Sequence, residues 1–147
     1  MADSEAVIAD GMGFSHRTSA AGITPKVWEE LGEAVSVSPP NPSRGTIDVT
    51  HLKSPGNTRE FRSGKIDPGE TTVVFNYTKT LRPKVDTIFA STALHEFMIS
   101  YPDGATETFS GVATGKPTEG GEVEGKLTMS LAIKLSGVSV YTAAPVV

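Results

Sequence analysis

The stretch RGTIDVTHLKSPGNTREFRSGKIDPGETTVVFNYTK, residues 44–79, contains two segments in which apolar and polar side chains alternate. Alternation with a period of two is typical of β-strands, because successive side chains of a strand point to opposite faces. One segment covers residues 46–50 and the other covers residues 72–78. The sequence therefore predicts a strand at each end of this stretch.

The connection between these strands, residues 52–70, is far longer than the roughly 2–5 residues of a tight hairpin. It contains two turn sequences, SPGN at residues 54–57 and DPGE at residues 67–70. It is also basic, with Glu60 as the one acidic residue among Lys53, Arg59, Arg62 and Lys65. A long, shaped and charged arm on a two-strand base favours a docking element. A plain extension of a hairpin is the alternative.

The same stretch resembles a pattern of the major tail tube proteins of long-tailed bacteriophages, dVT-x-L-x-SPG-x-x-REF-x-x-G-x-x-D-x-GE. The matching residues are Asp48, Val49, Thr50, Leu52, Ser54, Pro55, Gly56, Arg59, Glu60, Phe61, Gly64, Asp67, Gly69 and Glu70. The match is dense within this stretch and extends more loosely from residue 27 to residue 141. The first two dozen residues are poorly covered.

The resemblance implies a structural virion protein rather than an enzyme. Members of the family form hexameric rings in which each subunit's sheet joins a continuous β-barrel, and the rings stack into the hollow tube that conducts the genome. The implied partners are further copies of the chain and other tail proteins such as tape measure, terminator and tail-tip proteins. DNA is expected to pass through without specific binding. The implied location is the tail tube of the virion, after synthesis in the host cytoplasm.

Composition sets limits that agree with this assignment. A chain of 147 residues suits one domain with one core. Its 37% hydrophobic content, 15 glycines and 10 prolines favour short strands and turns, or a chain that buries part of its surface only on assembly. The net charge of −4 argues against a module that binds polyanions. The absence of cysteine excludes disulfides, and no apolar run is long enough to span a membrane.

The chain divides into a flexible N-terminal arm, residues 1–23, and a single tail-tube β domain, residues 24–147. Phe14 is the one large apolar side chain that could anchor the N-terminal arm. The N-terminus lacks the basic and apolar regions of a secretory signal, so we expect synthesis in the cytoplasm. Residues 24–38 fit a helix and a strand equally well, and the resemblance favours a strand bent at Gly32.

The remaining segments complete the predicted fold. A short helix can begin at Pro83, because Val85, Ile88 and Phe89 have helical spacing. Residues 94–101 and 106–114 predict a hairpin, and residues 126–136 predict a strand with one apolar face. The fold class is therefore all-β with one short α-helix: two packed antiparallel sheets, as a β-sandwich or a partly closed barrel, with a long hairpin arm.

No residue pattern indicates catalysis, a metal or a cofactor. His16, His51 and His95 are scattered and lack the spacing of metal ligands. No G-x-S-x-G nucleophile elbow occurs. Residues 111–117 resemble a phosphate loop but are one residue short, and Pro117 removes a needed N–H.

Charged and aromatic residues instead indicate contacts between copies of the chain. The candidate interface on the arm consists of Lys53, Arg59, Phe61, Arg62 and Lys65. Its candidate acidic partner consists of Glu119, Glu122 and Glu124, and residues 29–33 form a second acidic segment. Such charge runs can equally be solvated faces. A channel for DNA should repel or ignore phosphates, which makes neutral Thr, Ser and Asn faces, Asp48 and Glu96 candidates for the lumen.

A monomeric β-sandwich that serves in binding or adhesion is the alternative function. The size of the protein in solution separates the two hypotheses, because a binding module stays monomeric and a tube protein forms rings or filaments.

Overall fold

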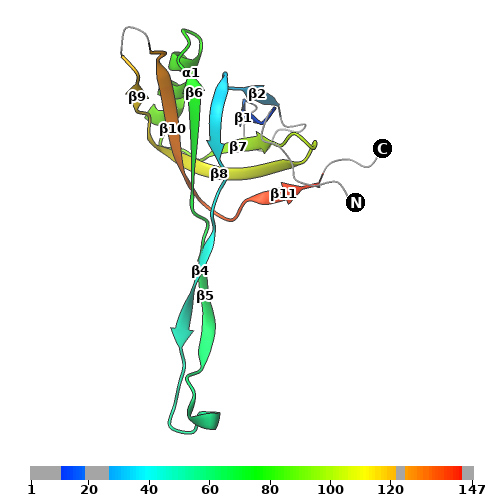
Figure 1. Ribbon diagram of the computed structural model, residues 1–147, viewed down its shortest axis with the longest axis vertical. Coiled ribbons are helices and arrows are strands. Elements are labelled where there is room, and N and C mark those ends of the chain that lie inside the picture. Colours follow the sequence, from blue (N-terminus) through cyan, green and yellow to red (C-terminus); the bar gives the residue numbers. More distant parts are fainter. Residues whose placement is uncertain (1–10, 19–26, 122–124, 144–147) are drawn as a thin grey trace.

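The computed structural model describes residues 11–18, 27–121 and 125–143. A curled body carries a long hairpin, the arm, that projects from one end (Figure 1). The elements are β1 (Gly13–Arg17), β2 (Trp28–Glu30), β3 (Ala34–Ser38), β4 (Ser43–Asp48), the 3₁₀ turn η1 (Pro55–Asn57), β5 (Phe61–Asp67), β6 (Glu70–Asn76), α1 (Leu81–Ala90), β7 (His95–Ser100), β8 (Thr106–Gly115), β9 (Thr118–Glu119), β10 (Thr128–Leu135) and β11 (Val140–Thr142).

The body is one nine-stranded antiparallel sheet with the order β2-β1-β7-β8-β10-β6-β3, to which β11 is added along β8 and β9 along β10. Its two outer strands, β2 and β3, are joined by residues 31–33 alone. Seven flat strands spaced by about 4.8 Å would place the outer ones about 29 Å apart. The four Cα–Cα steps from Glu30 to Ala34 span at most about 14 Å. The sheet must therefore curl until its two edges approach each other.

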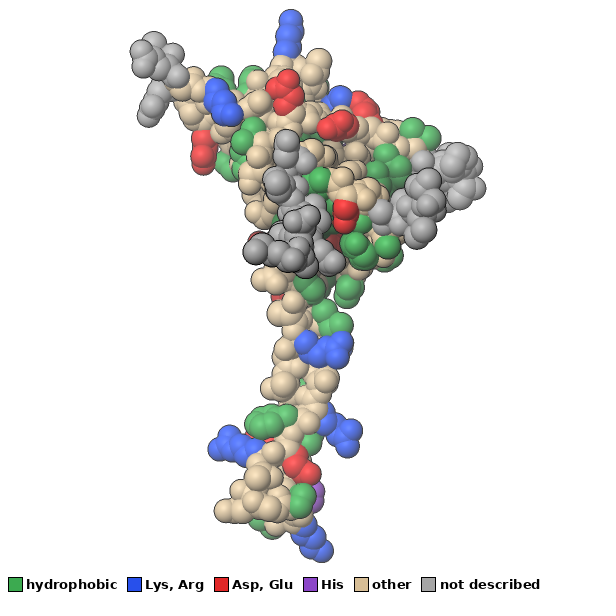
Figure 2. Space-filling view, turned by 45° about the vertical axis from the view of Figure 1, so that its right-hand side comes forward, with side chains coloured by type: hydrophobic (Ala, Val, Ile, Leu, Met, Phe, Trp, Pro, Cys, Tyr) green, Lys and Arg blue, Asp and Glu red, His purple; other side chains and the backbone are tan. Residues whose placement is uncertain are grey.

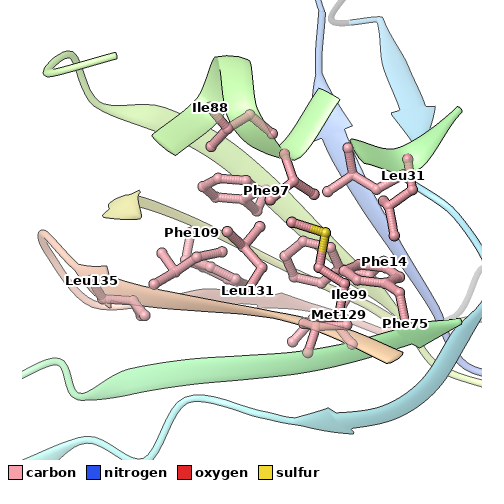
Figure 3. Close-up of a cluster of buried hydrophobic side chains, with 14 residues drawn as sticks. Phe14, Leu31, Phe75, Ile88, Phe97, Ile99, Phe109, Met129, Leu131 and Leu135 are labelled. Carbon is pink, nitrogen blue, oxygen red and sulfur yellow. The ribbon is translucent and has the colours of Figure 1, made fainter. Parts of the chain in front are cut away.

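The core fills the inside of this curl (Figure 3). Phe14, Phe97 and Phe109 stack at its centre, with ring centroids 5.5 Å apart for the first pair and 5.8 Å for Phe97 and Phe109. Offset stacking of aromatic rings adds to the stabilisation that their buried area gives. The other buried side chains are Leu31, Val73, Phe75, Leu81, Val85, Ile88, Ile99, Met129, Leu131, Ile133 and Leu135.

Strand β10 shows how the sequence produces this core. Every second residue from Met129 to Leu135 is buried, and the residues between them face away from the core. Its partner β8 carries Gly111 where the two backbones approach closely: a Cβ there would lie 2.6 Å from the Lys134 carbonyl oxygen. The β8–β10 register shifts between Ala132 and Ile133, beside this contact. Glycine at position 111 therefore permits the close packing of β8 against β10.

Helix α1 covers the upper end of the curl (Figures 1 and 3). Its buried residues, Leu81, Val85 and Ile88, recur at helical spacing. The helix begins two residues before the predicted Pro83, where the Leu81 N–H donates to the Thr78 hydroxyl at 3.1 Å. Asp86 on its outer face pairs with Lys116 at the end of β8. The predicted short helix is confirmed.

The smaller sheet is the arm itself, residues 43–67, in which β4 pairs with β5. This corrects the predicted base of the arm. Residues 46–50 do not pair with residues 72–78: β6 pairs with β3 and β10, and β4 pairs with a strand inside the predicted connection. Strand β5 could not be found from periodicity because all its residues except Gly64 are exposed.

The N-terminal segment also requires a correction. Residues 13–17, predicted as part of a flexible arm over residues 1–23, form β1 between β2 and β7. Phe14 is fully buried and contacts the rings of Phe75, Phe97 and Phe109. Burial of one aromatic side chain and pairing on both sides hold this strand in place. The rest of the predicted N-terminal arm, apart from residues 11, 12 and 18, lies outside the described residues.

The predicted fold class is confirmed: the chain is mostly β with one short helix, two antiparallel sheets and a long hairpin arm, and the large sheet is not closed into a barrel. The strand bent at Gly32, predicted for residues 24–38, is instead two strands, β2 and β3, which lie at the two outer edges of the sheet and are separated at residues 31–33. Within the residues that the structure describes, no helix is long and apolar enough to cross a membrane.

Gly111 gives a direct test of this packing. We expect Gly111→Ala to lower the free energy of unfolding by about 1–3 kcal/mol, because the new methyl group overlaps the β10 backbone. Gly115→Ala, in the same strand, is the matched control: its Cβ would meet nothing closer than 3.9 Å and should change stability by about ±0.5 kcal/mol at most. Urea unfolding followed by circular dichroism measures both. Equal stabilities of the two variants would contradict the close contact.

Candidate assembly surfaces

The arm is a two-stranded ribbon without a core of its own. Asp48 lies opposite Phe61 and Ile47 lies opposite Arg62, so these pairs occupy alternate faces of the ribbon. All of β4 is exposed. An isolated two-stranded hairpin is only marginally stable in water. The arm therefore has two faces that neither the described body nor the arm itself covers.

Large apolar side chains lie on these uncovered faces. Phe61 is 54% exposed and Ile47 56% exposed, and Leu52 at the tip is fully exposed. Val49 and Ile66 add to them. Large apolar side chains that stay exposed on both faces of a ribbon, with charged residues among them, favour an interaction site. The prediction from sequence selected Phe61 alone and missed Ile47, Leu52 and Ile66, which a count of apolar residues in the connection could have found.

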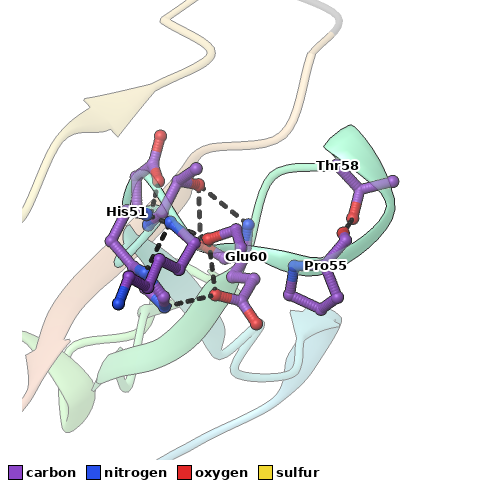
Figure 4. A network of polar contacts seen from close by, with 8 residues as sticks. His51, Pro55, Thr58 and Glu60 are labelled. Atoms are coloured by element: carbon purple, nitrogen blue, oxygen red, sulfur yellow. Dashed lines mark hydrogen bonds and ion pairs between the residues drawn. The ribbon is translucent and has the colours of Figure 1, made fainter.

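The tip of the arm is held in shape by its own hydrogen bonds (Figure 4). The Ser54 hydroxyl donates to the Glu60 carboxylate at 2.7 Å, and His51 Nε2 lies 3.4 Å from the same carboxylate. The Glu60 N–H donates to the Thr50 hydroxyl at 2.8 Å. Gly56 takes the left-handed conformation, with φ of 68°, in the predicted SPGN turn. The tip is thus a defined shape rather than a loose loop.

The base of the arm is fixed to the body. Gly69 has φ of 86°, and a Cβ there would lie 2.7 Å from the Asn41 carbonyl oxygen, so the DPGE turn requires glycine. The Gly69 N–H donates to Asp67 at 2.9 Å, and Lys134 Nζ on β10 lies 3.2 Å from the same carboxylate. These two contacts, the N–H first and Lys134 second, lower the pKa of Asp67 below its ordinary value. These contacts therefore fix the direction in which the arm projects from the body.

The basic residues of the arm differ from those of the body in their partners. Five cations of the body form ion pairs: Arg17, Arg82, Lys84, Lys116 and Lys134. Among the described residues, no carboxylate pairs with the five cations of the arm: Arg44, Lys53, Arg59, Arg62 and Lys65. Lys and Arg side chains extend into solvent along the arm in Figure 2.

One residue of the predicted acidic partner is described, and it lies at the other end of the body. Glu119 is exposed on β9, beside the start of β10. Glu122 and Glu124 lie outside the described residues. Glu30 and Glu33, from the second acidic segment, line a shallow hollow at the same end together with Gly32, Thr78 and Thr80. Within the described residues, the arm of a subunit does not approach Glu30, Glu33 or Glu119 of the same subunit.

The two lumen candidates lie far apart in the fold. Asp48 is on the arm, where the Thr50 hydroxyl and N–H hydrogen bond to it and lower its pKa. Glu96 is on β7 and pairs with Arg17 of β1 on the face of the sheet that points away from the core. This outer face is otherwise mostly neutral, and its hydroxyl side chains are Ser15, Thr72, Ser100, Thr108, Ser110, Thr128 and Ser130.

Two of the scattered histidines meet inside the body. His16 Nε2 lies 3.2 Å from His95 Nδ1, and both rings pack near Phe97. Burial and, to a smaller degree, the neighbouring His95 lower the pKa of His16, while Glu29 opposes them. Glu29 is itself paired with Lys84 of α1. Among the described residues, no group of three or more His, Asp or Glu side chains could hold a metal ion.

Comparisons with known proteins were made for sequence and for structure. A family model described as "Lambda phage tail tube protein" matches residues 12–142. A search of curated proteins by sequence finds no match.

Several solved assemblies contain chains of similar fold. A chain in the tail of an empty gene transfer agent particle, refined with C6 symmetry, superposes with a TM-score of 0.69 at 19% identity, over 90% of this chain and 96% of that one. A chain of an extracellular contractile injection system, from its sheath–tube complex in the extended state, gives 0.68 at 12% identity, over 95% and 93%. A chain of the SPP1 tail tube gives 0.63 at 8% identity, over 94% and 80%. At these identities the likeness shows the fold.

The histidine pair predicts a dependence of stability on pH. Because the pKa of His16 is lowered from 6.5, the unfolded chain takes up a proton more readily than the folded chain does. The contribution of the neutral His16 side chain to stability is present above about pH 6.5. It should be lost as the pH falls below that value. We expect the free energy of unfolding to fall between pH 7.5 and 5.5, and to fall less in His16→Gln. His51→Gln, on the exposed arm, is the control and should retain the slope of the unmodified protein. A slope unchanged by His16→Gln would contradict this assignment.

Proposed function

The chain belongs to the family of lambda phage tail tube proteins, and we propose that it builds the tube as stacked hexameric rings. It is a structural protein of the virion tail. The observation that carries the proposal is the arm, which exposes apolar side chains and unpaired cations on a shaped hairpin. Such a surface is expected where subunits dock.

Ring formation follows from the sheet edges. Among the described strands, β2, β3 and β11 each have an edge without a partner. Unpaired edges invite further pairing, and a cyclic ring lets the edges of neighbouring subunits pair with one another. The C6 symmetry belongs to the gene transfer agent tail, and its similar fold supports the same number of subunits here.

The arm is the proposed docking element between subunits. Lys53, Arg59, Phe61, Arg62 and Lys65 would contact an acidic surface of another copy, with Glu119, Glu122 and Glu124 among its residues. Apolar contact provides the stabilisation and charge complementarity provides the register. Glu119 lies at the end of the body away from the arm, which supports a contact between copies rather than within one subunit.

The outer face of the sheet is the proposed wall of the channel. Hydroxyl side chains dominate it, and Glu96 is neutralised by Arg17. Arg17 of β1 and Lys134 of β10 are both paired with carboxylates, which leaves these strands little free positive charge to bind phosphates, so DNA can pass. Asp48, on the arm, would add negative charge where the arm borders the channel.

Other tail proteins complete the proposed assembly. Solved structures of similar fold include chains in a sheath–tube terminator complex and in a tube-terminating cap. By analogy we expect this tube to meet tape measure, terminator and tail-tip proteins. The chain would be made in the host cytoplasm, and would need neither a cofactor nor enzymatic activity.

Reversal of charge on the arm tests the docking role. We expect Arg59→Glu with Arg62→Glu to stay folded, because exposed substitutions change stability by about ±0.5 kcal/mol. Tube formation should be lost, since acidic arms would face an acidic partner. Circular dichroism and electron microscopy of the same sample measure fold and assembly.

The matched control for this pair is Arg59→Lys with Arg62→Lys. It keeps a positive charge at both positions of the arm. This variant should form normal tubes. Normal tubes from the folded arm variant would instead exclude the docking role. A protein that remains monomeric at high concentration would favour the alternative, a binding or adhesion domain.

The proposed channel predicts weak interaction with DNA. We expect assembled tubes to show no salt-dependent affinity for duplex DNA. Such affinity arises when unpaired cations of a protein displace the counterions of DNA, and the proposed lining offers few such cations. Fluorescence anisotropy with labelled duplex, measured at low and high salt, tests this. Micromolar binding at low salt that disappears with added salt would indicate a DNA-binding surface and contradict the neutral wall.

A further inference from the structure

We propose that the His16–His95 pair is an acid-sensitive switch, which releases helix α1 from strand β2 when both imidazole rings are protonated. The switch is a property of the single subunit. Its consequence for assembly rests on the proposed function, because β2 is one of the sheet edges that would pair in a ring. The term "histidine corner" denotes His16, His95, Glu29 and Lys84.

The histidine corner joins four elements of the body. His16 of β1 lies opposite Glu29 of β2, and its Nε2 atom lies 3.2 Å from Nδ1 of His95 on β7. Lys84 of α1 forms an ion pair with Glu29. A hollow of about 190 Å³ at this corner is lined by His16, Glu29, Leu31, Lys84, Thr87 and Ile88. Because the hollow is open to solvent, protons can reach His16 in the folded subunit.

The hydrogen bond between the two rings limits how many protons the pair can hold. A neutral imidazole donates through one nitrogen and accepts through the other, whereas both nitrogens of an imidazolium are donors. A first proton leaves the bond intact, because the ring that stays neutral still accepts. A second proton leaves two N–H groups facing each other. Nε2 of His95 is buried without a hydrogen-bond partner among the described residues, so its N–H would also be unsatisfied.

The charged groups that face the pair cannot neutralise two further cations. Among the described residues they are Glu29 from β2 and Lys84 from α1, while the residue opposite His95 on β8 is Gly111. At neutral pH the carboxylate and the ammonium group cancel. With both rings charged, three cations would compete for the Glu29 carboxylate. Glu29 favours the charged form of His16, so Lys84 is the cation that loses its partner.

Strand β1 is held by contacts that do not depend on the charge of the histidines. Arg17 and Glu96, which follow His16 and His95 in the sequence, pair with each other on the opposite face of the sheet. Phe14 is fully buried in the aromatic cluster of the core. We therefore expect β1 to stay in the sheet when the pair is protonated.

Helix α1 is the element that protonation would release. Its ion pair with β2, between Lys84 and Glu29, is the contact that the charged rings disturb. Ile88 of the helix lines the same hollow, so charge on His16 would also lie beside its apolar side chain. The pair between Asp86 and Lys116 lies at the end of β8 and is unaffected. Release is therefore expected on the side of the helix that faces β2.

The pKa of His16 determines where the switch acts. Burial and, to a smaller degree, His95 lower this pKa from 6.5, while Glu29 opposes them. We therefore expect the helix to be held above about pH 6.5 and released as the pH falls below that value. Loss of its support leaves the β2 edge less ordered, so tube formation should require a higher protein concentration in acid.

Hydrogen exchange of the unmodified subunit at pH 7.5 and 5.5, followed by mass spectrometry and corrected for intrinsic exchange rates, tests the switch. The concentration is kept below that at which light scattering detects assembly. We expect acid to lower the protection of α1 roughly fivefold more than that of β10, because an ion pair is lost and like charges repel. Strand β10 reports on global unfolding. An equal fall in α1 and β10 would overturn the switch.

Substitutions in the histidine corner separate the switch from other effects of acid. His16→Gln with His95→Gln cannot take up protons in this range and should remove the additional loss in α1. His51→Gln, on the arm, is the control and should retain it. Lys84→Gln leaves both histidines in place, and should lower the protection of α1 already at pH 7.5 and reduce its change in acid. A full α1 response in the double histidine variant, or an unchanged α1 in Lys84→Gln, would overturn the assignment.

Tube formation distinguishes this inference from the proposed function. By light scattering and electron microscopy, the unmodified protein should need a roughly threefold higher concentration at pH 5.5 than at pH 7.5, and the double histidine variant should need no more. Equal tube formation at both pH values despite release of α1 would overturn the link to assembly. Tubes formed by a protein whose α1 shows no local response would overturn the switch and leave the tube function intact. A local response in a protein that forms no tubes at either pH would overturn the proposed function alone.

Discussion

Three residues, 31–33, join the two outermost strands of the large sheet, and most of the fold follows from that short link. A flat sheet of this order cannot be connected by so few residues, so the sheet curls and encloses a core on one face only. Gly32 allows the link to press against Leu81 of α1, which covers the upper end of the curl. The core, the helix position and the hollow beside Gly32 are thus consequences of one connection.

The same curl explains why the arm exists as a separate feature. Strands β3 and β6 pair inside the body, and the chain continues from them into β4 and β5 of the arm. The turn at Gly69 and the contact between Asp67 and Lys134 lie where the arm begins. Beyond this point no second layer covers the ribbon, and apolar residues such as Phe61 and Ile47 remain exposed. Ordering such a hairpin costs conformational entropy that burial does not offset within one subunit. Contacts with another subunit, as proposed for the arm, would supply the burial that one subunit lacks.

Sequence alone predicted the elements whose side chains alternate between core and solvent. Strand β10 and the helix residues Val85 and Ile88 were found because burial imposes their periodicity. Strand β5 was missed because neither of its faces is buried, and β1 was missed because Phe14 is its only large apolar residue. Arm residues were predicted from charge and resemblance. The distance between the arm and the acidic residues could not be predicted, since it depends on strand order rather than on spacing in the chain.

The pairing of charged side chains differs between the arm, the body and the outer face of the sheet. Among the described residues, the five cations of the arm pair with no carboxylate, whereas five of the seven cations of the body do. The outer face of the sheet between the two ends is mostly neutral, with Arg17 and Glu96 cancelling each other. Unpaired positive charge on that face would bind DNA through counterion release. Charge at the ends that was paired within the subunit could not attract another copy. In the assembly that we propose, a subunit whose outer face is mostly neutral and whose arm is basic can attract other copies without retaining the DNA that passes along that face.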